Sequence, residues 1–315
     1  MGYTLNFQRK VDAEKWISEI KTQDNSSLID DITLASFINL WFQRYAEVKK
    51  APSSVLRDRE LARHVLSFFS NSRKLGEINV SEVEHFLSRK IRTLSPGTCN
   101  RIRSFLHKIY NDAIKWRFVK SNPISAISRF HELRKPPTYW TNEEITAFLN
   151  YSKNKQYHDV FKFALNTGMR MGEILALKWD TINFDIRIIN VFRTYDNVSK
   201  DIKDYCKSRR YRCIGMNSAI LEVLVKLRQD KYPLVFHDGQ GNVIKPRSLQ
   251  HTFRRCNLAS GVKRIRFHDL RHSYGSHYMM NGGNAYDLMH LMGHSDIKVT
   301  EIYAHLSHDH ISQKA

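Results

Sequence analysis

The sequence predicts a mainly α-helical protein with a small antiparallel β-sheet, in which a helical first domain precedes a mixed α/β second domain. Over most of the 315 residues, apolar side chains recur every three or four positions, which is the period of an amphipathic helix. The period changes to that of strands only beyond Trp179. A proline-containing segment at 133–138 separates the two domains as an exposed linker.

The first domain is predicted over 31–132. It follows a polar, charged segment at 1–30 that contains one short helical pattern. Four apolar stripes predict a bundle of helices, and Thr33 and Ser95 are placed to cap the first and the last of them. The stripes are Leu34, Phe37, Ile38, Trp41 and Tyr45; Leu61, Val65, Leu66 and Phe69; Val83, Phe86 and Leu87; and Ile102, Phe105, Leu106, Ile109, Tyr110 and Ile114.

The second domain is predicted over 139–315, including a C-terminal tail. Thr141 and Glu144 match a capping box, so helices are expected at 142–151 and 157–167. Strands are expected from the apolar residues Ile182, Phe184, Ile186, Ile188 and Val191, and a further pair is expected on either side of a basic turn at 208–210. Helices are expected again at 217–229, 246–260, 268–281, 284–292 and 296–306.

The charge of the chain favours a polyanionic partner. Fifty Lys and Arg residues against 31 Asp and Glu give a net charge of +19. A basic protein without such a partner is the alternative, and no long apolar run or lipidation signal points to a membrane. The N-terminus has no apolar signal-peptide core, so a cytoplasmic location in a bacterial cell is expected.

The cysteine and histidine patterns predict no metal site. The four cysteines have no Cys-x-x-Cys spacing, and reduced thiols are expected. His305, His308 and His310 lie close together near the end of the chain, but no paired ligand set accompanies them and a polar tail explains them better. No cofactor is expected.

Six residues in the second half of the chain predict the chemistry. They are cation or imidazole donors followed by one phenol: Arg170, Lys207, His268, Arg271, His294 and Tyr303. Fixed donors suit a phosphate whose charge rises in a transition state, and a tyrosine hydroxyl suits attack on that phosphate. The pattern therefore predicts phosphoryl transfer on a nucleic-acid backbone.

The segments around these residues resemble those of the tyrosine recombinases, that is, the phage integrases and the Xer-type recombinases. The segments are Thr167-Gly168-Met169-Arg170-Met171-Gly172-Glu173, His268-Asp269-Leu270-Arg271, and Gly293-His294-Ser295 followed by Tyr303. The resemblance covers roughly 33–310. It implies a helical (SAM-like) core-DNA-binding domain followed by a catalytic domain of the tyrosine-recombinase fold, which together clamp duplex DNA.

The resemblance also implies a role for each matching residue. Arg170 and Arg271 would hold the non-bridging oxygens of the scissile phosphate, and His268 and His294 would donate hydrogen bonds or transfer protons. Tyr303 would attack phosphorus, leaving a 3′-phosphotyrosyl link and a free 5′-hydroxyl. Glu173 would orient the site. No metal ion and no nucleotide take part.

A lysine on a strand hairpin would protonate the leaving 5′-oxygen. Lys207 is the candidate, because it precedes the segment Ile214-Gly215-Met216, where many relatives have Ile-Pro-Leu. The glycine at that position weakens the match, so Lys203 and Lys200 remain alternatives.

Further basic residues are candidates for phosphate contacts: Arg57, Arg63, Arg101, Arg103, Lys108, Arg209 and Arg210. Ordinary solvated helix surface is the alternative for each of them. Likewise, Arg170 could simply pair with Glu173, Arg271 with Asp269, and Tyr303 could be a half-buried helix residue.

The favoured function is a site-specific integrase of a phage or mobile element, acting on double-stranded attachment sites as a homotetramer through a Holliday junction. A segment around 7–16 resembles the end of an arm-DNA-binding module, so a DNA-bending protein and an excisionase are possible partners. The alternatives are a type IB topoisomerase-like enzyme and a catalytically inactive DNA-binding regulator.

Overall fold

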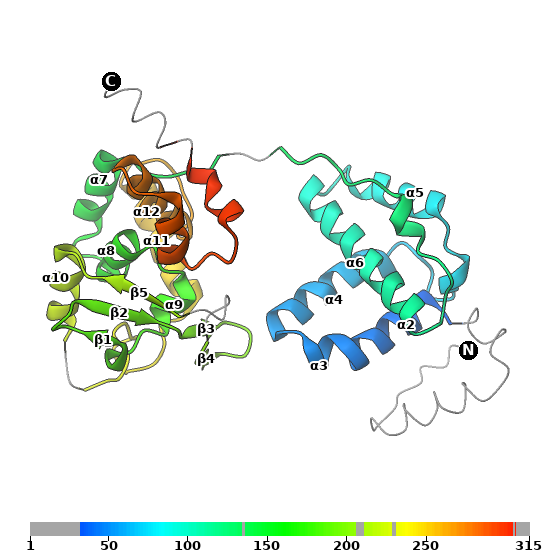
Figure 1. Ribbon diagram of the computed structural model, residues 1–315, viewed down its shortest axis with the longest axis horizontal. Helices are drawn as coiled ribbons and strands as arrows, with labels where there is room; N and C mark the ends of the chain where they lie inside the picture. Colours follow the sequence, from blue (N-terminus) through cyan, green and yellow to red (C-terminus); the bar gives the residue numbers. More distant parts are fainter. Residues whose placement is uncertain (1–31, 134–135, 206–210, 229–230, 305, 307–315) are drawn as a thin grey trace. The chain divides into compact units, whose positions relative to one another are not determined.

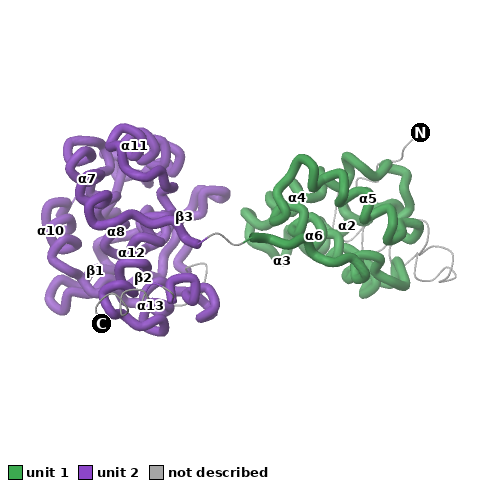
Figure 2. The backbone as a smooth tube through the Cα atoms, turned by 90° about the horizontal axis from the view of Figure 1, so that it is seen from above, with its two compact units in different colours: residues 1–134 green, residues 135–315 purple. Residues whose placement is uncertain are grey.

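The computed structural model describes residues 32–133, 136–205, 211–228, 231–304 and 306. The chain divides into two compact units, 1–134 and 135–315 (Figure 2). Each unit has its own hydrophobic core. Both are built mainly from helices, and a small antiparallel sheet lies in the second unit, as the sequence predicts (Figure 1). Among the described residues, no helix combines the length and the apolar character that crossing a bilayer requires.

Two helices of the first unit begin at the residues that the sequence predicts as caps. Thr33 accepts a hydrogen bond from the Ser36 amide and starts the first helix, and Ser95 accepts one from the Thr98 amide and starts the longest. The elements are α2 (Leu34–Trp41), a π-helical turn (Phe42–Ala46), α3 (Glu47–Lys49), α4 (Pro52–Leu66), α5 (Val80–Lys90) and α6 (Pro96–Lys115), with short 3₁₀ turns at Leu75–Glu77 and Pro123–Ala126.

The apolar stripes pack into one core around Trp41, whose indole donates to the Asp112 carboxylate at 2.6 Å. Two details differ from prediction. Phe69 is buried but lies beyond the end of α4, and Ile114 is 36% exposed, because it falls on the solvent side of α6 near its last turn.

The first helix of the second unit is capped by Thr141, which forms the predicted capping box with Glu144. Its helices are α7 (Asn142–Ser152), α8 (His158–Thr167), α9 (Met171–Leu175), α10 (Ser218–Leu227), α11 (Pro246–Ala259), α12 (Asp269–Met280) and α13 (Ala285–Met292). A cluster of aromatic side chains, in which Trp140, Phe148, Phe161 and Phe253 contact one another, forms the centre of its core.

Five short strands form two sheets within the described residues. The strands β1 (Ile182–Asn183), β2 (Ile188–Val191) and β5 (Arg212–Gly215) pair antiparallel in the order β1-β2-β5, and β3 (Thr194–Asp196) pairs with β4 (Asp201–Lys203). Strands are present before and after 206–210, which lie outside the described residues, but β4 and β5 belong to different sheets and do not pair with each other. Phe184 and Ile186, both predicted in a strand, lie in the turn between β1 and β2, and Ile186 is 64% exposed.

The segment around Tyr303 differs most from prediction. In place of one helix over 296–306, the described residues form two 3₁₀ turns, Ile297–Val299 and Glu301–Tyr303. The Thr300 side chain is fully buried between the two turns, and its hydroxyl bonds a histidine rather than solvent. Tyr303 packs with Leu288, Met292 and Leu306 in a small separate core beside α12 and α13.

Candidate active site

The turn between α8 and α9 positions the first arginine. Gly168 ends α8 with φ +60°, a left-handed conformation that glycine adopts without strain. Arg170 then caps α9, and Glu173 at the third helical position accepts from the Arg170 amide at 2.9 Å and from its guanidinium Nη1 at 2.9 Å. Pairing at this spacing is the structural alternative that the sequence raises, but here the carboxylate is buried.

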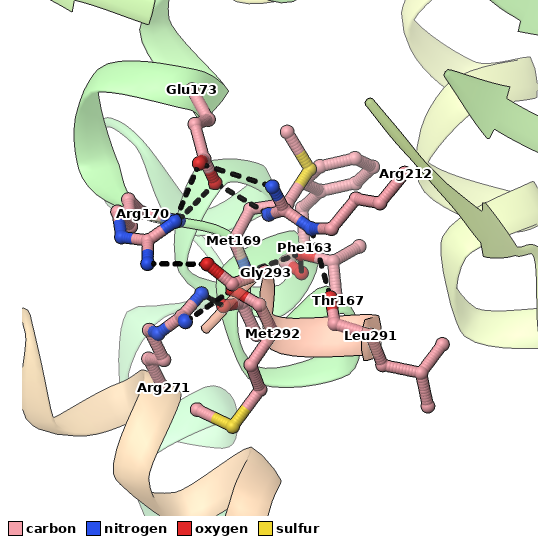
Figure 3. A network of polar contacts seen from close by, with 11 residues as sticks. Phe163, Thr167, Met169, Arg170, Glu173, Arg212, Arg271, Leu291, Met292 and Gly293 are labelled. Atoms are coloured by element: carbon pink, nitrogen blue, oxygen red, sulfur yellow. Dashed lines mark hydrogen bonds and ion pairs between the residues drawn. The ribbon is translucent and has the colours of Figure 1, made fainter. Parts of the chain in front are cut away.

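A second arginine, from the sheet, pairs with the buried Glu173 carboxylate. Arg212 on β5 donates from Nη1 at 3.1 Å and from Nη2 at 2.6 Å to the two carboxylate oxygens, and from Nε to the Leu291 carbonyl at 2.8 Å (Figure 3). Burial alone would raise the pKa of Glu173, but the hydrogen bonds and charge of Arg212, together with Arg170, lower it to about 2. The carboxylate is therefore ionised and holds both guanidinium groups.

The sequence analysis did not single out Arg212, because its role depends on which side of β5 is buried and on a partner far away in the chain. The burial of β5 alternates, with Arg212 and Ile214 on the inner side. A charged residue on the apolar face of a strand requires a buried partner, and Glu173 is the carboxylate that supplies it.

Arg271 is buried on the first turn of α12. Its guanidinium donates to the Gly168 carbonyl at 2.6 Å and to the Met292 carbonyl. Asp269, the partner that the sequence offers as an alternative, instead pairs with Arg266 at 2.8 Å, so that alternative is wrong. Burial and the nearby charge of Arg170 lower the pKa of Arg271 to about 9, which leaves it cationic at neutral pH.

The C-terminus of α13 brings the two arginines together. Arg170 Nη2 donates to the Gly293 carbonyl at 3.0 Å, and Arg271 donates to the preceding carbonyl of Met292, so the two guanidinium groups lie side by side (Figure 3). Carbonyls at the end of a helix carry partial negative charge and lack partners within the helix. Each guanidinium has five N–H donors, of which these hydrogen bonds to the protein use two, leaving donors for a phosphate.

His294 follows these carbonyls directly and is buried. Its Nδ1 lies 2.8 Å from the Thr300 hydroxyl, a contact that orients the ring. Burial, with the positive charges of Arg271 and Arg170, lowers its pKa to about 3, so the ring is neutral at pH 7. Thr300 is a second contributor that the sequence analysis did not single out.

His268 lies at the N-cap of α12 and is exposed. The surrounding protein shields part of the ring from water, and together with His272 and Arg271 it lowers the pKa of His268. His268 and His272 meet edge to face, with ring centroids 5.6 Å apart.

Tyr303 is fully buried, and its hydroxyl lies 2.6 Å from His272 Nδ1. The alternative of a half-buried helix tyrosine is therefore wrong: the residue is enclosed, in a 3₁₀ turn. Burial raises the pKa of Tyr303 to about 12, so the phenol keeps its proton at neutral pH. The ring lies so close to α12 that a Cβ at Gly275 would be 3.0 Å from Tyr303 Cζ.

Two of the three lysine candidates, Lys203 and Lys200, lie in the β3–β4 hairpin. Lys203 is on β4, with its Nζ 3.8 Å from Asp201, and Lys200 is in the turn at φ +57°. The hairpin packs directly on α9, because a Cβ at Gly172 would lie 2.7 Å from the Thr194 hydroxyl. Lys207 lies outside the described residues.

The predicted phosphate contacts of the first unit separate into two groups. Arg57, Arg63 and Arg101 are exposed. Arg103 donates to the carbonyls of Ile127 and Ile124 at 2.7 and 3.4 Å, and Lys108 pairs with Asp112 at 2.8 Å and lies over the Tyr45 ring. Arg209 and Arg210 lie outside the described residues.

A cavity of about 680 Å³ adjoins the site between α11 and the segment before α12. It extends from Met171, next to Arg170, to His268, and Arg254, Arg264 and Arg266 contribute to its wall. Within the described residues, no group of three or more His, Cys, Asp and Glu side chains could hold a metal ion.

These residues form a site suited to one type of chemistry. Two adjacent guanidinium groups and a neutral imidazole can bind a phosphate and stabilise charge that grows on its oxygens. A phenol paired with an imidazole can supply the nucleophile. The structure brings together Arg170, Glu173, Arg271 and His294 from three separate segments, and it holds Tyr303 beside His272 on the same helix as Arg271.

Comparison with known proteins gives consistent matches. The family model described as the phage integrase family matches residues 139–310. A tyrosine recombinase XerC-like protein of Caldanaerobacter subterraneus subsp. tengcongensis is 22% identical, over 93% of this chain and 84% of its own length.

Two solved structures share the fold. The Tn1549 transposon integrase in complex with a circular intermediate DNA has a TM-score of 0.76 at 19% identity and covers 90% of this chain and 98% of its own. The lambda integrase tetramer bound to a Holliday junction has a TM-score of 0.70 at 17% identity, covering 93% and 90%.

Proposed function

This chain belongs to the phage integrase family of tyrosine recombinases, and from that premise we propose that its second unit cuts and rejoins DNA at specific sites through a covalent tyrosine intermediate. The substrate is double-stranded DNA, in keeping with the net charge of +19 and with the DNA complexes of the Tn1549 and lambda integrases. The biological outcome is the integration and excision of a phage or other mobile element.

One observation carries the proposal: Arg170 and Arg271 donate to two consecutive carbonyls, Gly293 and Met292, immediately before His294. Two fixed cations next to the residue that carries a neutral imidazole support a single phosphate-binding position. A scissile phosphate bound there would have its non-bridging oxygens stabilised as their charge rises in the transition state. Glu173 and Arg212 hold Arg170 in place and do not take part in bond making.

In the cleavage step, Tyr303 Oη forms a bond to phosphorus and the bond from phosphorus to the 5′-oxygen breaks. The products are a 3′-phosphotyrosyl link and a 5′-hydroxyl, whose proton comes from a lysine, with Lys207 preferred over Lys203 and Lys200. Attack by a 5′-hydroxyl of another strand reverses the step and joins new partners. His268 and His294 donate hydrogen bonds to the phosphate.

Strand exchange requires more than one copy of this chain. We infer a homotetramer on two DNA duplexes that passes through a Holliday junction, supported by the lambda integrase tetramer to which the fold is similar. A DNA-bending protein and an excisionase would set the direction of the reaction, and the enzyme would act in the cytoplasm of a bacterial host.

The test is covalent trapping on a nicked suicide duplex carrying the junction sequence of the element, in the presence of EDTA. The wild type is expected to form a slowly migrating protein–DNA adduct, and Tyr303→Phe is expected to bind the same DNA without forming it. Tyr286→Phe, which changes an exposed tyrosine on α13, is the matched control and should form the adduct. An adduct in Tyr303→Phe would reject this nucleophile, and no adduct from a wild type that binds the DNA would reject the activity.

A further inference from the structure

His272 contacts the hydroxyl of Tyr303, the proposed nucleophile. The mechanism proposed above gives His272 no role. It follows Arg271 on α12, and its Nδ1 lies 2.6 Å from Tyr303 Oη, a short and direct hydrogen bond. The two rings are tilted at 45° with centroids 5.8 Å apart, so the contact is made through the ring edge and not by stacking.

The Tyr303 hydroxyl has few other neighbouring groups that could accept its proton. Tyr303 is fully buried, and within the described part of the chain its hydroxyl forms a hydrogen bond only with His272. Of the two histidines already in the site, His294 is bonded through Nδ1 to Thr300, and His268 contacts His272 rather than the tyrosine.

The tyrosine must lose its proton as it attacks. A phenol becomes more acidic as its oxygen donates electrons to phosphorus, so a positioned base removes the proton as the bond forms. A general base must lie within hydrogen-bond reach of the proton it takes, and His272 Nδ1 already satisfies this condition.

Resting on the proposed function, we propose that His272 is a further catalytic residue, the general base that accepts the Tyr303 proton during cleavage and returns it during rejoining. In cleavage, the proton moves from Tyr303 Oη to His272 Nδ1 while the bond from Oη to phosphorus forms and the bond to the 5′-oxygen breaks. The 5′-oxygen takes its proton from a different group, the lysine. In rejoining, His272 gives the proton back to the departing phenol.

The protonation states agree with this assignment. Burial lowers the pKa of His272 even though Asp269 opposes that shift, so the ring is neutral and able to accept at neutral pH. The pKa of Tyr303 is raised, so the phenol holds its proton until attack begins. The exposed His268, edge to face with His272, offers a route for exchange of that proton with solvent.

The experiment measures single-turnover cleavage of a suicide duplex by wild type, His272→Asn and His277→Asn. Asn at position 272 keeps a hydrogen-bonding side chain but cannot act as a base at neutral pH. His277 is the matched control, because it is also a half-buried histidine of α12 with a ring nitrogen bonded to the protein, at 2.7 Å from the Trp140 carbonyl. Thermal unfolding and DNA binding are measured for each.

We expect His272→Asn to cleave at least about 100-fold more slowly than wild type, the usual loss on removing a general base. A substrate with sulfur in place of the bridging 5′-oxygen separates this role from that of the leaving-group acid, because a thiolate leaves without a proton. Such a substrate should not restore His272→Asn. Imidazole added to His272→Ala should restore part of the rate.

The proposal is overturned if His272→Asn cleaves within a few-fold of wild type, or if the sulfur substrate restores it. It is also overturned if the loss in His272→Asn matches that in His277→Asn and follows reduced stability. Because the wild type and the control report on cleavage independently, these outcomes leave the proposed function standing. Absence of cleavage by the wild type overturns both.

Discussion

At the scale of single residues, Glu173 joins Arg170 and Arg212 through one buried carboxylate. Its carboxylate accepts from Arg170 at 2.9 Å and from Arg212 at 2.6 Å while being almost completely buried. Removing one partner of a buried ion pair leaves an uncompensated charge, which typically costs about 3–5 kcal/mol. The position of Arg170, and hence of the phosphate it would bind, depends on this buried contact.

Glu173 also predicts how stability depends on pH. Its pKa in the folded protein is about 2, below the ordinary value of 4.5, so its stabilising contribution is complete above pH 4.5 and is lost as the pH falls towards 2. We expect the free energy of unfolding of the second unit to decrease over this window by on the order of 3 kcal/mol from this group. Denaturant unfolding at a series of pH values measures it.

In Glu173→Gln the acid dependence should be weaker, and the variant should be less stable than wild type at neutral pH. Glu301→Gln, a substitution of an exposed glutamate beside Tyr303, serves as control and should leave the profile unchanged. Parallel profiles for wild type and Glu173→Gln would contradict the assignment.

At the scale of elements, the turn from α8 to α9 connects the two arginines. Gly168 ends α8, its carbonyl accepts from Arg271, and Arg170 begins α9 two residues later. A Cβ at position 168 would lie 2.4 Å from Tyr274 Cδ1 on α12, so the glycine is needed for helix packing as well as for its positive φ.

Gly168→Ala should therefore be destabilising and should slow cleavage, since Tyr274 must move and the carbonyl that holds Arg271 shifts with it. Strain at a left-handed position contributes about 1–3 kcal/mol by itself. Gly261→Ala is the matched control, because Gly261 has φ +74° but no atom within 4 Å of the added Cβ. Thermal unfolding and single-turnover cleavage measure the difference, and equal effects of the two substitutions would reject a role for the packing against Tyr274.

At the scale of the whole molecule, positive charge is spread over both compact units, and its uses differ between residues. Arg101 and Arg103 lie two positions apart on α6. Arg101 is exposed, whereas Arg103 is bonded to the carbonyls of Ile127 and Ile124. We propose the exposed Arg101, and not Arg103, for a phosphate contact, because Arg103 is half-buried and two of its donors hold these carbonyls.

We expect Arg101→Ala to reduce the slope of log affinity against log salt by about one, the change for one lost phosphate contact. Arg103→Ala removes the same charge but should leave the slope nearly unchanged and lower the stability of the first unit by about 1 kcal/mol, because two carbonyls lose a donor. DNA titrations at several salt concentrations, with thermal unfolding, distinguish the two. Equal changes in slope would reject the distinction.

The sequence by itself determined the helical class, the capped starts of α2, α6 and α7, and the residues proposed for the chemistry, because these depend on local periodicity and on short motifs. Only the tertiary structure decided which partners those residues have. Arg212 reaches Glu173 across the sheet, Arg271 bonds carbonyls instead of Asp269, and Tyr303 sits in a 3₁₀ turn against His272. Such contacts join residues far apart in the chain, and burial sets their strength, so no local pattern encodes them.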